Sequence, residues 1–150
     1  MDKKIDNALI GAAGVHFVAS ELSFRGLIAL PTMRNTAGID VIVSNRKGSW
    51  HANLQVKTSK KKVGFWPVGY SYKKLNGRNN YYVFLRYLNK KGQFEAFLEA
   101  ADRVVRRAAK NYSRYKNEGY AEFAPCWHLP KDEKQQLRLI KQWEDFGKNK

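Results

Sequence analysis

Two short segments with strand-forming patterns, residues 39–44 and 50–58, flank the turn-forming tetrapeptide Asn-Arg-Lys-Gly. The first segment is rich in β-branched residues, and the second alternates apolar with polar residues as a half-buried strand does. Residues 81–87 and 93–98 repeat this arrangement around Asn-Lys-Lys-Gly. Two hairpins in succession restrict the chain to folds that are built around a β-sheet.

Segments with helical patterns flank these hairpins on both sides. Apolar residues at three- and four-residue spacing, with helix start and stop signals, favour helices. The sequence predicts helices over residues 5–25, 99–115 and 131–146, a short strand over residues 27–30 and a long loop over residues 59–79. The predicted order is therefore αβββ(loop)ββαα, which favours an α/β (α+β) fold with a mixed central β-sheet flanked by helices.

The length of the chain suits one domain, residues 1–150. We expect its core to occupy about residues 5–98 and a C-terminal helical part to occupy about residues 99–150. The helical spacing predicts a buried stripe of Ile5, Leu9, Ala12, Ala13, Phe17 and Leu22 in the first helix, and of Leu137, Ile140 and Trp143 in the last. Gly11 and Gly14 lower the helical propensity of the first helix and indicate that a neighbouring element approaches it closely.

Positive charge is concentrated in the first two thirds of the chain. The formal net charge is +15, and the segment 41–94 contains twelve basic residues and no carboxylate. A one-signed stretch of this length is typical of a protein with a polyanionic partner, of which nucleic acid is the commonest. A basic solubilising face and a surface for anionic membranes are the alternatives.

The sequence also indicates where such a chain works. No apolar run approaches the roughly 20 residues of a membrane span, and the N-terminus carries acids in place of an apolar signal core. The single cysteine, Cys126, cannot form an internal disulfide. We therefore expect a cytoplasmic protein without a membrane partner.

One set of polar residues lies within the first hairpin. Asp40 begins an apolar strand, and Gln55 and Lys57 lie two residues apart on its partner, so that both project from one face. If Asn45 pairs with Gly48, Asp40 lies opposite Asn53 on that same face. Diagonal neighbours there are about 7–8 Å apart, a gap that one metal ion could bridge.

The segments Gly-Ile-Asp-Val at residues 38–41 and Leu-Gln-Val-Lys-Thr-Ser at residues 54–59 resemble the active-site hairpin of the PD-(D/E)XK nuclease superfamily, which has the restriction-endonuclease-like fold. In that family an Asp opens one strand and an acid-x-Lys or Gln-x-Lys tripeptide ends the next. This chain is similar to small bacterial members with Gln-x-Lys. The resemblance covers roughly residues 11–98, and the predicted element order fits the α-β-β-β-α-β core of the family.

The resemblance implies a role for each matching residue. Asp40, the side-chain carbonyl of Gln55 and the backbone carbonyl of Val56 would be ligands of Mg²⁺ or Mn²⁺. Lys57 would orient or deprotonate the attacking water and offset charge on the scissile phosphate. Such an ion polarises the phosphoryl oxygen and lowers the pKa of bound water.

The first helix departs from the family pattern. Where the family commonly has a Glu after the glycine, this chain has Val15, next to His16. Glu21, an acid of this helix, is a further candidate catalytic residue, although it lies about 600° around the helix from position 15. The alternative for Glu21 is an ion pair with Arg25. His16 is adjacent to position 15 and could contribute, but we expect a structural role for it.

Basic and aromatic residues between and beyond the two hairpins predict a nucleic-acid surface. Phosphate contacts from the basic residues and base stacking by the aromatic residues are expected, and the alternative for the aromatic residues is a lid over the sheet. The candidate nucleic-acid-binding residues are Lys60, Lys61, Lys62, Trp66, Lys73, Lys74 and Arg78, and the aromatic residues with them are Phe65, Tyr70 and Tyr72. Arg103, Arg106, Arg107 and Lys110 recur on one helical face and extend the basic surface.

These observations predict a Mg²⁺-dependent endonuclease that hydrolyses phosphodiester bonds of DNA. A homodimer would suit it, because two strands of a duplex need two sites. The alternative is a catalytically inactive module that binds nucleic acid and keeps the nuclease fold. RNA as the natural target is a third possibility, which the aromatic residues support.

Overall fold

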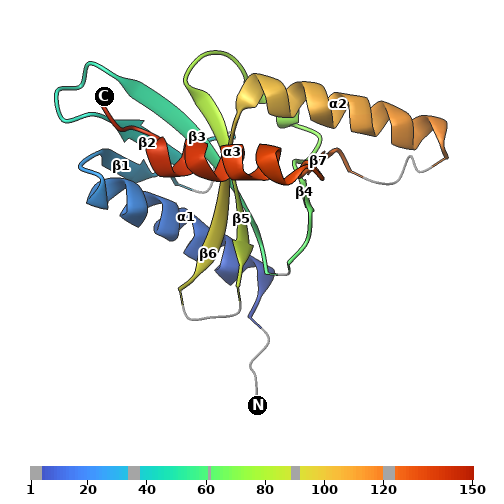
Figure 1. The fold of residues 1–150 in the computed structure, drawn as a ribbon, viewed down its shortest axis with the longest axis horizontal. Coiled ribbons are helices and arrows are strands. Elements are labelled where there is room, and N and C mark those ends of the chain that lie inside the picture. Colours follow the sequence, from blue (N-terminus) through green and yellow to red (C-terminus); the bar gives the residue numbers. More distant parts are fainter. Residues whose placement is uncertain (1–4, 34–37, 61, 89–91, 120–123) are drawn as a thin grey trace.

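A mixed five-stranded sheet forms the centre of the computed structural model, which describes residues 5–33, 38–60, 62–88, 92–119 and 124–150 (Figure 1). The strand order is β1-β2-β3-β5-β6, with β3 and β5 parallel and the other pairs antiparallel. The strands are β1 (Ile28–Pro31), β2 (Val41–Ser44), β3 (His51–Ser59), β5 (Asn80–Tyr87) and β6 (Phe94–Ala100). The predicted fold class, a mixed sheet flanked by helices, is confirmed.

Three helices flank this sheet: α1 (Asn7–Phe24), α2 (Ala101–Asn117) and α3 (Glu133–Asp145). All three agree with the predicted segments to within about two residues at most ends. Asp6 caps α1 by accepting a hydrogen bond from the amide of Ala8, and Asp132 caps α3 in the same way. Glu99, the predicted first residue of the second helix, belongs to β6. None of the described helices is both long and apolar enough to cross a membrane.

The segment between β3 and β5 contains structure that the sequence did not predict. Strand β4 (Phe65–Pro67) pairs with β7 (Cys126–His128) in a separate two-stranded sheet, and a 3₁₀ turn, η1 (Tyr72–Lys74), follows β4. Strands of three residues are too short to show a periodic pattern, and the pairing joins segments that are distant in the chain. The predicted long loop is therefore partly ordered by the C-terminal region.

Two apolar clusters cover the two faces of the sheet. In the first cluster, Val18 and Leu22 of α1 and Trp143 of α3 pack on one face, against residues such as Leu54 and Val83. In the second cluster, Trp66, Trp127 and Val104 pack with Tyr82 and Phe84 on the other face. Because Leu139 belongs to the second cluster and Trp143 to the first, α3 lies across the edge strand β6 (Figure 1).

The predicted buried stripes were wrong at several positions. Leu9 is 66% exposed and Leu137 is 64% exposed, whereas Ile10 and Leu139 are buried in their helices. Apolar residues occur nearly all around α1, so their spacing does not select one face. In α3 the edge strand β6 sets the buried face, and only Ile140 and Trp143 of the predicted stripe pack against the clusters.

Helix α1 approaches β3 closely at Gly14, as the two glycines indicated. A Cβ atom at Gly14 would lie 2.0 Å from Oγ1 of Thr58 and 3.1 Å from Cδ1 of Leu85. A Cβ atom at Gly11 would meet nothing within 4 Å. The close approach therefore depends on Gly14 alone.

We expect Gly14→Ala to destabilise the protein and Gly11→Ala to stabilise it. The first substitution must push α1 away from Thr58, at a cost of about 1–3 kcal/mol. The second gains helical propensity of up to about 1 kcal/mol. Urea denaturation of the two variants beside the wild type measures both free energies of unfolding. Equal effects of the two substitutions would contradict the close approach.

Candidate functional site

Asp40 lies immediately before β2, and its carboxylate bonds to strand β3. Its Oδ2 atom accepts hydrogen bonds from the backbone amide of Val56 at 2.7 Å and from Nε2 of Gln55 at 2.6 Å. Its own amide donates to the carbonyl of Leu54 at 2.8 Å. Because β2 begins only at Val41, the Asp40 carboxylate, and not a backbone carbonyl of β2, accepts the hydrogen bond of the Val56 amide. Among the described residues, no hydrogen bond involves the second oxygen, Oδ1.

The register of the hairpin differs from the predicted one by two residues. Val41 pairs with Leu54, so Asp40 lies next to Gln55 and not opposite Asn53. The reason is the connection between the strands, where the side chain of Asn45 accepts hydrogen bonds from the amides of Ser49 and Trp50 and lengthens the turn. A shift of two residues leaves the facing side of each strand unchanged. Asp40 and Gln55 are therefore brought together, as the motif requires.

Lys57 is half-buried beside this pair. Burial lowers the pKa of its ammonium below the usual value of 10.5, and the negative charge of Asp40 opposes this shift. Lys57 therefore holds its proton less firmly than an exposed lysine does. A lysine of this kind can stabilise negative charge and take part in proton transfer.

Tyr82 is the partner of Gln55 on the neighbouring strand β5. Burial, together with the charge of Asp40, raises the pKa of Tyr82 to about 12. Its hydroxyl donates a hydrogen bond to the carbonyl of Tyr72 at 3.4 Å. Tyr82 therefore stays neutral at physiological pH and contributes packing and no charge.

A pocket of about 460 Å³ opens over these residues. Asp40, Gln55, Val56 and Lys57 line it from the sheet, and the N-terminal half of α1 lines it from the other side. The helix contributes small side chains there, because Ala8, Gly11 and Ala12 leave space that larger residues would fill; the remaining lining residues are Val15, His16, Pro31, Thr32 and Met33. The pocket gives a substrate or an ion access to the Asp40 carboxylate.

The oxygen atoms of this pocket suit a hard cation in kind. Asp40 offers one carboxylate, Val56 a backbone carbonyl and Gln55 an amide oxygen, and Mg²⁺ is commonly held by one or two carboxylates with water and phosphate oxygens. Gln55 now donates its amide to Asp40, so its oxygen would have to turn toward a shared ion. No group of three or more acidic, histidine or cysteine side chains that could hold a metal occurs in the part of the chain that the structure describes. One carboxylate and two neutral oxygens would therefore hold an ion only with further oxygen ligands from water or a substrate.

Glu21 does not join the other predicted catalytic residues. Its carboxylate pairs with Arg25 at 3.7 Å, which is the alternative that the sequence offered. Both residues line a different hollow, together with Glu95 and Glu144. Val15 and His16 line the Asp40 pocket instead, so the helix that approaches the site presents a histidine and no carboxylate.

Two of the aromatic residues lie in the core. Trp66 is 1% exposed, and its Nε1 donates a hydrogen bond to the carbonyl of Leu85. Tyr72 is also buried in the second cluster. The prediction of Trp66 as a nucleic-acid contact is therefore wrong, because a buried ring cannot stack on a base. Phe65 and Tyr70 are exposed.

The predicted basic contacts separate into two groups. Lys73 and Lys74 are exposed on η1, and neither is among the residues that line the Asp40 pocket. Lys62 lines the hollow that contains Glu21. Lys60 is half-buried and Arg78 is exposed, and Lys61 lies outside the described residues.

Two polar residues of the pocket were not given a functional role from the sequence. His16 was assigned a structural role, and Thr32 was not considered. His16 carried a weak signal, since it follows the position of the family's helix glutamate. Thr32 carried none, because its place in the pocket follows from the pairing of β1 with β2.

No protein-family model matches the chain, and no curated protein matches it. Among solved structures, a bacterial homing endonuclease is similar to this chain, with a TM-score of 0.46 and 14% sequence identity. The similarity covers 85% of this chain and 78% of that chain. A likeness of this size carries no argument about function, which must come from the residues of the site.

We expect Lys57→Met to match or exceed the thermal stability of the wild type at pH 7. Because folding lowers the pKa of Lys57, the unfolded chain binds more protons between the folded pKa and 10.5, and the wild type gains stability as pH rises through that window. The advantage of Lys57→Met should therefore shrink toward pH 10.5. Melting temperatures between pH 7 and pH 10.5 test this, with the exposed turn variant Lys47→Met as control. Greater destabilisation by Lys57→Met than by Lys47→Met at pH 7 would contradict it.

Proposed function

We propose that this protein is a metal-dependent endonuclease of the PD-(D/E)XK type that hydrolyses phosphodiester bonds of DNA. The observation that carries the proposal is the contact of the Asp40 carboxylate with Gln55 and with the amide of Val56, beside a half-buried Lys57. The three motif residues, Asp40, Gln55 and Lys57, thus line one accessible pocket.

Each residue has a distinct part in this reaction. Asp40, Gln55 and the carbonyl of Val56 would hold Mg²⁺ or Mn²⁺, which supplies charge to polarise the phosphoryl oxygen and acidify a bound water. Lys57 donates hydrogen bonds to a nonbridging phosphate oxygen or to the attacking water, and its lowered pKa suits it to pass a proton. Lys73 and Lys74 hold neighbouring phosphates of the strand.

A catalytically inactive binding module is the second candidate. A specific observation favours it: the helix beside the pocket offers Val15 and His16, and Glu21 is paired elsewhere. With one carboxylate in the pocket, the affinity for a metal ion would be modest without a phosphate to complete the ligand set. The endonuclease is preferred because the position and pKa of Lys57 serve the chemistry and are not needed for binding alone.

A cleavage assay distinguishes these candidates. We expect the wild type to nick supercoiled plasmid DNA with Mg²⁺ or Mn²⁺, and Asp40→Asn and Lys57→Met each to lose at least about 100-fold in rate. Asp40→Asn keeps an oxygen that can accept the hydrogen bond of Val56, so the fold is retained. The matched controls are Glu133→Gln and Lys47→Met, which change exposed residues of the same types.

The outcomes separate clearly. Cleavage that persists in Asp40→Asn and Lys57→Met would show that the activity comes from another site or from a contaminant. Binding without cleavage by the wild type would establish the inactive module. Single-stranded DNA and RNA in the same assay, together with a measurement of molecular mass in solution, test the DNA preference and the proposed homodimer.

A further inference from the structure

A second basic site lies between α2 and α3, separate from the Asp40 pocket. Its cleft has a volume of about 630 Å³ and is lined by Arg103, Arg106, Arg107, Lys134, Gln135 and Arg138. Five of these six side chains are cationic, and none is a carboxylate. No residue lines both this cleft and the Asp40 pocket.

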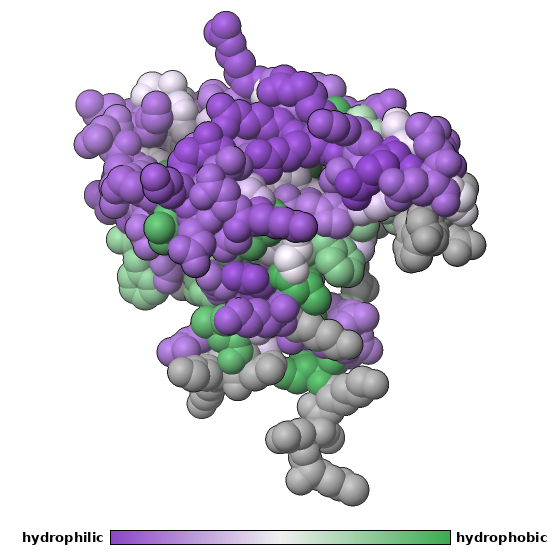
Figure 2. All heavy atoms as spheres, turned by 45° about the vertical axis from the view of Figure 1, so that its right-hand side comes forward, coloured by the Kyte–Doolittle hydropathy of each residue, from purple (hydrophilic) through white to green (hydrophobic). Residues whose placement is uncertain are grey.

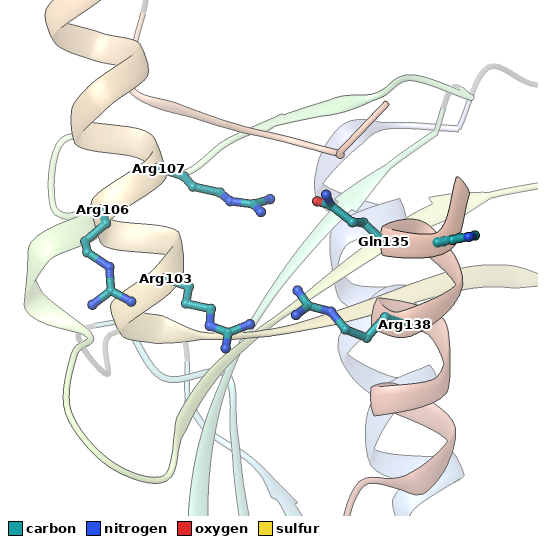
Figure 3. Close-up of a pocket in the computed structure, with 6 residues that line it drawn as sticks. Arg103, Arg106, Arg107, Gln135 and Arg138 are labelled. Carbon is teal, nitrogen blue, oxygen red and sulfur yellow. The ribbon is translucent and has the colours of Figure 1, made fainter. Parts of the chain in front are cut away.

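Side chains of like charge converge across this cleft. Figure 3 shows that Arg103 of α2 and Arg138 of α3 point toward one another, and that Arg107 and Gln135 do the same one turn away. Arg106 lies farther around α2 and does not reach across toward α3. Guanidinium groups that face each other repel, and an anion between them would offset this repulsion.

Arg103 is the one cation of the cleft that has a carboxylate partner among the described residues, since buried Glu99 lies 3.8 Å from it. Asp102 accepts a hydrogen bond from the amide of Gly77. Asp132 accepts one from the amide of Lys134 as the helix cap. Within the described ranges, no carboxylate comes within ion-pair distance of the other four cationic side chains of the cleft, Arg106, Arg107, Lys134 and Arg138.

The surface around the cleft favours a phosphate polymer over other anions. The side of the molecule that carries α2 and α3 is covered by hydrophilic side chains (Figure 2), whereas a helix that lies on a membrane presents apolar residues as well. Guanidinium groups bind phosphate oxygens in a bidentate manner. The cleft is open at the surface, so a strand can pass through it.

We propose that the cleft between α2 and α3 binds the phosphate backbone of nucleic acid. This inference rests on the proposed function for the identity of the ligand. Arg107 and Arg138, from opposite sides, bind successive phosphates, and Arg103 is held in place by Glu99. A nucleic acid that contacts this cleft and the Asp40 pocket together is held at two places, so the cleft helps to orient the substrate.

The test compares two variants that lose the same charge. Arg107→Gln/Arg138→Gln changes the cleft, and Arg46→Gln/Lys47→Gln changes the exposed turn between β2 and β3. Fluorescence anisotropy with a duplex oligonucleotide in EDTA, over a range of KCl concentrations, measures binding without cleavage. Arg103 is left unchanged because its removal would strip buried Glu99 of its partner.

We expect the cleft variant to bind the duplex at least about tenfold more weakly and to lose about two units of the slope of log K against log salt, since each phosphate contact contributes about 0.9. The turn variant should keep most of both. Neither variant should melt below the wild type, because each removes mutually repelling charge.

Several outcomes would overturn the proposal. Equal losses in both variants would mean that net charge alone acts, and unchanged binding in the cleft variant would mean that the cleft is not used. Competition by polyglutamate as strong as by single-stranded DNA would indicate an acidic protein partner, and binding to phosphatidylserine vesicles with no effect on duplex would indicate a membrane. Because binding is measured without metal, a loss of binding in the cleft variant can be observed even if the wild type shows no cleavage. The two proposals are therefore distinguishable.

Discussion

The parallel pairing of β3 with β5 is the constraint on which the rest of the structure depends. Parallel neighbours cannot be joined by a tight turn, so the chain must cross over between them. Here the crossover carries β4 and η1, which supply Trp66 and Tyr72 to the second cluster. That cluster in turn holds β7 and α2. The same pairing places Gln55 beside Tyr82 and Lys57 beside Phe84. Apolar residues of the second cluster therefore lie next to the candidate site.

Asp40 serves the fold and the proposed chemistry at once. Its Oδ2 atom satisfies the amide of Val56, which would otherwise lack a backbone acceptor from β2. This bond holds the carboxylate at the pocket, although Asp40 itself lies outside β2. Asp40 lines the pocket, and this bond explains how a single carboxylate is held in place just before β2 begins.

The sequence predicted the larger elements because their patterns are strong and local. The two hairpins and all three helices were found, and Asp40, Gln55 and Lys57 were recognised from type and spacing. The register was wrong by two residues because the side chain of Asn45 lengthens the turn. Pairing of β4 with β7 depends on residues far apart in the chain, so the burial of Trp66 could not be foreseen.

The same limit applies to the two functional surfaces. The sequence showed the arginines of α2 but not Lys134 and Arg138, which recur four residues apart on α3 and could have been noticed. That the two helices face each other across a cleft follows only from their packing along β6. The sequence placed the excess of positive charge mainly in the acid-free segment 41–94. The five cations of the cleft, however, lie on α2 and α3, outside that segment.

The most direct test of the central claim is to locate a bound ion by nuclear magnetic resonance. Mn²⁺ is paramagnetic and broadens the amide signals of residues close to it. With the protein bound to a short DNA duplex, we predict that substoichiometric Mn²⁺ first broadens the amides of Asp40, Gln55 and Val56, and that Asp40→Asn removes this effect. Broadening centred on Glu21 and Glu144, on Asp145, or on no residue would contradict a metal-dependent site at Asp40.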